Sequence, residues 1–174
     1  MENKERKRNR ILILFFLLIT MAAICLAVWA LFFRDSEKPL VPDYAPETEE
    51  NAEPIPGDTG EAAPSTGGGS VTITYSNQVK ISLAEGTAEL MFANPGKSNK
   101  DMVMQIIIGE TVLAESGRLE PGNQVKTIKL QDGIIDILEL GGYDGKFMIY
   151  YFDTETGAQE IVNTEMPITI TVEE

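Results

Sequence analysis

Apolar and polar residues alternate with a period of two through most of residues 71–174. Because successive side chains of a β-strand point to opposite faces, this period predicts strands with one buried face. Short stretches rich in glycine, proline, asparagine and aspartate separate the alternating runs and indicate tight turns. The apolar positions of the expected strands are Val71, Ile73 and Tyr75; Val79, Ile81 and Leu83; Ala88, Leu90 and Phe92; Met102, Met104, Ile106 and Ile108; Val112 and Ala114; Ile128 and Leu130; Phe147, Ile149 and Tyr151; and Met166, Ile168, Ile170 and Val172.

Two of these runs are apolar on both faces. Residues 147–152 are apolar or aromatic at every position, so this strand is expected in the middle of a sheet. Residues 103–112 contain three consecutive isoleucines, 106–108. As an edge strand, this run could pair with another protein by strand addition. As a central strand it would simply be core, which is our expectation.

Seven to nine short strands in roughly 100 residues, without an amphipathic helix of useful length, predict an all-β domain over residues 71–174. The expected architecture is a β-sandwich of immunoglobulin-like type. A local signal supports it, because Leu138, Gly141 and Tyr143 fit the pattern Leu-x-x-Gly-x-Tyr just before the most apolar strand. This pattern is similar to a tyrosine corner, in which the hydroxyl bonds back to the backbone. These three residues are therefore interpreted as structural.

A different pattern occupies the beginning of the chain. From Ile11 to Phe33 the sequence holds 23 residues without a charge, enough for a helix of roughly 35 Å that spans a bilayer. Residues 1–10 carry five basic and two acidic residues, which predicts a cytoplasmic N-terminus and an extracytoplasmic remainder. A cleaved signal peptide is a rival reading, but the run exceeds the usual apolar length and Leu-Phe-Phe follows the small residues. A lipoprotein with Cys25 as the lipidated residue is another, and Ile24 disfavours it.

Residues 34–70 contain six of the nine prolines and nine acidic residues, and they end in Ser-Thr-Gly-Gly-Gly-Ser. Apolar residues are too few to form a core, so this stretch is expected to be a disordered, acidic stalk between membrane helix and domain.

The amino-acid composition argues against several classes of function. The net charge of −13 disfavours nucleic-acid binding, because phosphates are repelled. The chain has no histidine, and its single cysteine lies in the membrane segment. We therefore expect no metal or cofactor, no thiol chemistry and no small-molecule substrate. Carboxylates are the remaining catalytic material: Asp132, Asp136, Asp144, Asp153 and Glu155. They are interpreted as solvated turn residues, so the protein is not expected to be an enzyme.

One loop is a candidate for partner binding. Asn94, Lys97, Ser98, Asn99 and Lys100 make the segment after the third strand polar and mildly basic. It could contact wall phosphate or a partner protein, although an exposed loop does not require either.

A set of structural motifs, Asn94-Pro95, Ser98, Leu119-Glu120-Pro121-Gly122 and Gly142-Tyr143, resembles those of small extracytoplasmic sandwich proteins of Gram-positive bacteria. The resemblance covers about residues 71–172 and implies the sandwich fold but no active site. The expected function is a membrane-anchored, non-catalytic adaptor or binding domain for an envelope or membrane protein. The alternative is a module that binds cell-wall polymer or carbohydrate, which would use exposed aromatic side chains for stacking.

Overall fold

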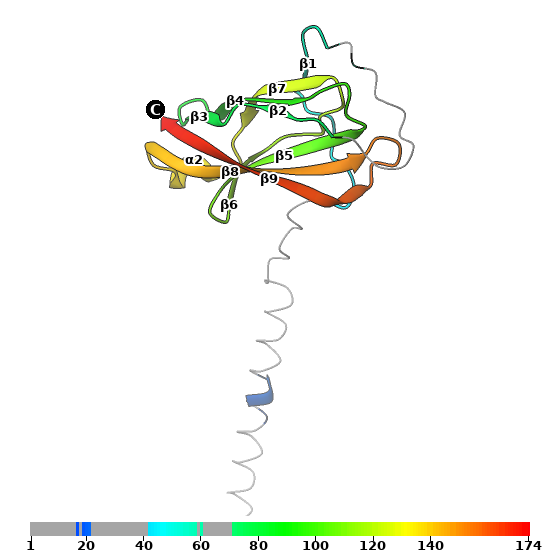
Figure 1. The fold of residues 1–174 in the computed structure, drawn as a ribbon. Coiled ribbons are helices and arrows are strands. Elements are labelled where there is room, and N and C mark those ends of the chain that lie inside the picture. The colour runs from blue at the N-terminus through cyan, green and yellow to red at the C-terminus, as the bar shows by residue number, and fades with distance from the viewer. Residues whose placement is uncertain (1–16, 18, 22–41, 59, 61–70) are drawn as a thin grey trace, which may run out of the picture. The chain divides into compact units, whose positions relative to one another are not determined.

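The computed structural model describes residues 17, 19–21, 42–58, 60 and 71–174 (Figure 1). The chain divides into two compact units, Met1–Leu40 and Val41–Glu174. In the first unit, residues 17 and 19–21 are helical. The basic tail and the rest of the expected membrane segment, from Ile11 to Phe33, lie outside the described residues. Within the described part of the chain, no helix is both long enough and apolar enough to cross a membrane.

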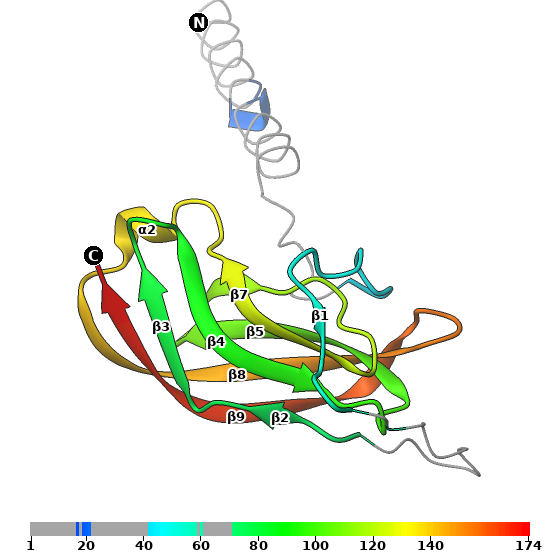
Figure 2. The ribbon, with the colours of Figure 1, turned by 90° about the horizontal axis from the view of Figure 1, so that it is seen from above.

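The second unit is built on one curled β-sheet (Figures 1 and 2). The all-β class that the alternating sequence pattern predicts is confirmed. The strand order is β1-β7-β4-β3-β9-β8-β5-β6, and β2 pairs with β4 beside this path. The strands are β1 (Glu53–Pro54), β2 (Thr74–Tyr75), β3 (Gln78–Ser82), β4 (Thr87–Asn94), β5 (Lys100–Ile108), β6 (Thr111–Glu115), β7 (Asn123–Lys129), β8 (Gly141–Asp153) and β9 (Gln159–Glu173), with one short helix, α2 (Ile134–Ile137).

The sheet curls over on itself, and β9 is the strand that connects its two halves. Its antiparallel pairing with β8 runs from Gln159 to Val172, whereas its parallel pairing with β3 covers only Thr169 to Glu173. Figure 2 shows β3 and β4 crossing in front of β8. The main core lies on the inner face of this curl. Its largest fully buried side chains include Phe92, Phe147, Ile81, Met102, Met104, Ile106, Leu113, Leu119, Ile128, Ile149 and Ile170.

Strands β5 and β8 are central, as their two-sided apolar pattern predicts. β5 pairs with β6 and β8, and β8 pairs with β5 and β9. On the outer face, Val103, Tyr150 and Phe152 form a second apolar cluster, against which Ala45 packs. The run of three isoleucines is therefore core, and it offers no free edge for strand addition.

The predicted disorder of residues 34–70 is wrong for residues 42–58. This segment, here called the strap, is ordered against the sheet, whereas residues 34–41 and 61–70 lie outside the described residues. Figure 1 shows the strap in cyan beside the β-sheet. The β-domain therefore begins at residue 42 rather than 71.

Backbone hydrogen bonds, rather than apolar burial, hold the strap in place. Ala45 donates to Gly157, and Gln159 donates back to Asp43, which fixes the strap to the β8–β9 turn. The strap then pairs with Arg118 and, as β1, with the edge of β7. At its end the Asp58 carboxylate accepts hydrogen bonds from the N–H groups of Gly96 (2.7 Å) and Gly60 (2.9 Å). Composition alone predicted disorder because these partners are distant in sequence.

Candidate functional site

Among the residues that the structure describes, no strand pairs with one side of β9 over most of its length. β8 occupies the other side, and β3 begins to pair only at Thr169. Among the described residues, no backbone group bonds to the open side between Glu160 and Ile168. A free strand edge of this kind presents unsatisfied N–H and C=O groups that another chain can use.

The pairing register shows which backbone groups of β9 are available. Thr169 donates its N–H to Asn77, and Glu173 accepts from Leu83, so odd-numbered residues point away from β8. The register with β8 is continuous from Val172 back to Asn163. Because strand residues alternate in direction, Asn163 and Glu165 direct both backbone groups into open space. Pro167 also occupies an outward position, where its missing N–H is tolerated.

A groove of about 510 Å³ runs beside this edge. Val71 and Ile73, which precede β2, line one wall, and Val162 and Thr164 of β9 line the other. Val71 is 37% exposed and Val162 is 67% exposed, so the groove offers apolar surface to solvent. Its volume lies in the range of about 300–1,000 Å³ typical of binding pockets.

The inner part of the groove lies against the core. Tyr151 lines it and is only 6% exposed. The hydroxyl groups of Tyr151 and Thr164 lie 2.6 Å apart and form a hydrogen bond. Tyr151 belongs to the main core cluster, so its ring joins the groove to the core.

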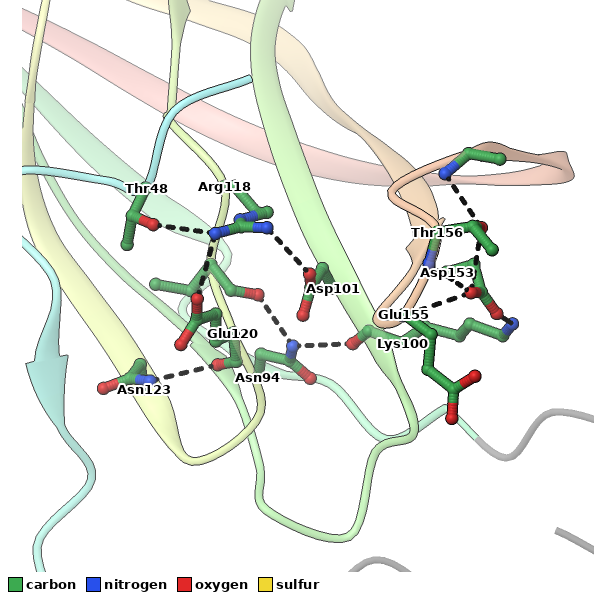
Figure 3. Close-up of polar contacts among 12 residues, drawn as sticks. Thr48, Asn94, Lys100, Asp101, Arg118, Glu120, Asn123, Asp153, Glu155 and Thr156 are labelled. Carbon is green, nitrogen blue, oxygen red and sulfur yellow. Dashed lines mark hydrogen bonds and ion pairs between the residues drawn. The ribbon is translucent and has the colours of Figure 1, made fainter. Parts of the chain in front are cut away.

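An ion-pair cluster forms the rim at the β8–β9 turn. The Lys100 amine lies 3.0 Å from Asp153 Oδ2 and 2.5 Å from Glu160 Oε1. Hydrogen bonds to Glu160 and then Asp153 raise the pKa of Lys100. The pKa of Asp153 is lowered, chiefly by the N–H of Thr156 and next by Lys100 (Figure 3). These contacts hold the turn against β5.

Two residues of the predicted partner-binding loop have buried side chains, and partner binding by this loop stays a prediction. Asn94 and Ser98 are fully buried, so no partner reaches their side chains. Asn94 Nδ2 donates to the carbonyls of Lys100 and Leu119, both at 2.9 Å, and Ser98 Oγ donates to the Lys100 carbonyl at 3.3 Å. Lys97 is exposed, Asn99 is half-buried and Lys100 belongs to the groove rim. The loop therefore serves mainly to fix the start of β5.

A second polar cluster fastens the strap beside this loop (Figure 3). Arg118 donates to Thr48 Oγ1 and to Glu120 Oε1, each at 3.1 Å, and lies 3.7 Å from Asp101. Asp101 is 3% exposed, and its burial raises the pKa of its carboxyl while Arg118 opposes that shift. The cluster has a clear structural role, because it joins the strap to β5.

The hydroxyl of Tyr143 donates a hydrogen bond to the Glu139 carbonyl at 2.9 Å, four residues upstream. Gly141, between them, has a φ of 146°, which side chains other than hydrogen disfavour. Leu138 is half-buried against the core, whereas Ile134, at the start of α2, is 6% exposed. Of these two side chains Ile134 is the more deeply buried, and the sequence motif did not single it out.

The candidate carboxylates do not converge. Asp132, Asp136, Asp144 and Glu155 are exposed, and Asp153 is engaged by its own turn and Lys100. In the part of the chain that the structure describes, no group of three or more histidine, cysteine, aspartate or glutamate side chains could hold a metal ion.

The groove was missed by sequence reasoning. The signal that could have revealed it is the adjacent pair Ile161-Val162 in an otherwise alternating strand, followed by Pro167. Two neighbouring exposed apolar residues and an in-strand proline are together typical of an edge strand.

Comparison with known proteins adds little. No protein-family model matches the chain, and no curated protein matches it either. A solved structure with some similarity is AggA, the major subunit of aggregative adherence fimbriae type I from Escherichia coli. It shares 10% identity at a TM-score of 0.31, over 63% of this chain and 98% of that one. This similarity is too low to establish a shared fold, so the proposals below do not rest on it.

Proposed function

We propose that this chain is a non-catalytic, membrane-anchored adaptor whose β-domain binds an envelope or membrane protein outside the cytoplasm. The observation that carries the proposal is the apolar groove beside the free edge of β9. Apolar surface and unpaired backbone groups in one place are typical of a site that binds another chain.

The domain is proposed to be an immunoglobulin-like sandwich. Support comes from the strand order, in which β3 lies between β4 and β9 and the short parallel pairing of β3 with β9 joins the two halves of the curl. The Tyr143 hydrogen bond at the start of β8 also has the geometry of a tyrosine corner. Its anchor is proposed to be the apolar run from Ile11 to Phe33, with the basic N-terminus in the cytoplasm.

The groove suits a protein partner better than a sugar polymer. Sugar-binding surfaces use exposed aromatic rings, and among the described residues the exposed aromatic side chains are Tyr44 and Tyr75. Tyr75 lies edge-on against Phe147, with ring centroids 6.1 Å apart, so its ring is part of the packing. No observation therefore favours the wall-polymer alternative.

The test is site-specific photo-cross-linking of the full chain in native membranes. A photoreactive residue at Thr164, inside the groove, should give one dominant adduct with another protein. The same residue at Lys80, an exposed position of β3 away from the groove, is the matched control and should not. Adducts no different from those of an anchor-only chain would contradict the adaptor function.

A further inference from the structure

The shape of the groove restricts what can fill it. The outward N–H and C=O groups of Asn163 and Glu165 can pair with the complementary backbone groups of another segment. A helix cannot supply them, because its own N–H and C=O groups bond to each other. An extended segment can, and it would place every second side chain into the groove between Val71 and Val162.

The length of such a segment is limited at both ends. Pro167 offers no N–H, and beyond it β3 already pairs with β9 from Thr169 onward. At the other end the register between β8 and β9 shifts between Tyr150 and Phe152. Only a short strand can therefore be added, and its side chains must provide much of the specificity.

Charge decides between the candidate occupants. Glu160 and Glu165 flank the free edge, with side chains 40% and 57% exposed, and each already forms an ion pair, with Lys100 and Lys146 respectively. The charge that selects an occupant is therefore that of the chain as a whole. The whole chain carries a net charge of −13. A second copy would carry the same net negative charge and be repelled, whereas a basic segment would be attracted.

Building on the proposed function, we propose that the groove receives an extended, basic segment of a partner protein, added as a strand to the free edge of β9. Its β-branched apolar side chains occupy alternate positions and fill the groove beside Val162 and Thr164. Its lysine or arginine residues complement the net negative charge of the chain. β-Branched residues suit this position because they favour the extended backbone.

The test measures fluorescence anisotropy with the full chain in lipid nanodiscs. The probe is a set of labelled seven-residue peptides with Val, Ile or Thr at alternate positions and Lys at both ends. Binding should be saturable and should weaken as salt rises, because exposed charges are screened. Peptides with Glu in place of Lys, or with N-methyl groups on alternate amides, should bind at least about tenfold more weakly.

Matched variants on neighbouring residues distinguish the groove from the rest of the strand. Val162→Asp, on the groove wall, should weaken peptide binding about tenfold or more. Ile161→Asp introduces the same charge at a fully exposed position outside the groove lining and should change affinity less than about twofold. Asn163→Pro removes an outward N–H and should also weaken binding. Circular dichroism of each variant checks that the β-domain is folded.

Several results would overturn the strand-addition proposal. These are failure of every basic peptide to bind, undiminished binding of the N-methylated peptides, or equal effects of the Ile161 and Val162 variants. If sedimentation shows a dimer of this chain, and the dimer is absent in Asn163→Pro, the occupant of the groove is a second copy of the chain rather than a segment of another protein. If Thr164 still cross-links to a membrane protein in any of these cases, the adaptor function stands and only the mode of binding is wrong.

Discussion

The carboxylate of Glu49 accepts a hydrogen bond from the backbone N–H of Gly117 at 2.6 Å. The two backbones are so close that a Cβ atom on Gly117 would lie 2.7 Å from Glu49 Cα. Gly117 lies between β6 and β7, and Glu49 lies in the strap. This contact joins two segments that are 68 residues apart in sequence.

Gly117→Ala should therefore displace the strap. The new methyl group meets backbone atoms, which cannot rotate away, so we expect a loss of about 1–3 kcal/mol in the free energy of unfolding. Hydrogen exchange at residues 42–58 should accelerate. Gly142→Ala is the matched control, because a Cβ there meets nothing within 4 Å. Unchanged exchange of the strap in Gly117→Ala would show that the contact is not maintained in solution.

Removal of the strap should destabilise the domain. A soluble fragment of residues 42–174 should unfold cooperatively, and a fragment of residues 71–174 should be less stable by at least about 2 kcal/mol, since several backbone hydrogen bonds are lost. The shorter fragment should also bind a hydrophobic dye, because Val103 and Phe152 lose the cover that includes Ala45. Guanidinium unfolding compares the two, and equal midpoints would restore the original boundary at residue 71.

Tyr143→Phe removes one hydroxyl and the hydrogen bond to Glu139. We expect a loss of about 0.5–1 kcal/mol, at the low end for a hydrogen bond, because this contact is solvent-exposed. Tyr44→Phe is the control, since its side chain is 68% exposed and it should be neutral. Urea unfolding measures the free energy of unfolding of both variants. Equal values for the two would mean that the Tyr143 hydrogen bond does not stabilise the domain.

Ile134→Ala should cost more than Leu138→Ala. Ile134 is 6% exposed within the main core, so its truncation should cost about 2–5 kcal/mol through lost burial and a residual cavity. Leu138 is half-buried and should cost less. Chemical unfolding of the two variants in parallel gives the comparison. The reverse order would mean that Leu138 is the side chain that fills the space beneath the corner.

Asp153 should make stability depend on acid pH. Its folded pKa is lowered from 3.8, chiefly by hydrogen bonding from Thr156 and Lys100, so its contribution is present above pH 3.8 and is lost as pH falls below it. Asp153→Asn should therefore be less stable than the wild type at pH 7, and the difference should shrink at pH 3. Asp144→Asn, at an exposed position of β8, should keep the acid dependence of the wild type. A constant difference between Asp153→Asn and the wild type at both pH values would contradict this assignment.

The alternation of side chains determined the all-β class and the two central strands. Residues 147–152 and the isoleucines at 106–108, within the run 103–112, show two apolar faces in the sequence, and they lie in the central strands β8 and β5. This information is local, because each strand must bury its own apolar side chains, whichever face they lie on. Turns could also be predicted from local sequence. Gly133 and Gly157 adopt positive φ values that other residues disfavour, so a glycine between two alternating runs indicates a turn.

Only the tertiary structure decided that the strap is ordered, that the loop after β4 is partly buried, and where the free edge of β9 lies. The strap is poor in apolar residues, and its order depends on backbone partners near Gly117, Gly122 and Gly157. Asn94 looks like an exposed turn residue in the sequence, yet it is buried because the Leu119 carbonyl lies within hydrogen-bond distance. The groove exists because β3 meets β9 only at its end. Hydrogen-bond partners distant in the chain leave no periodic trace in the sequence, and for that reason they become visible only in the folded chain.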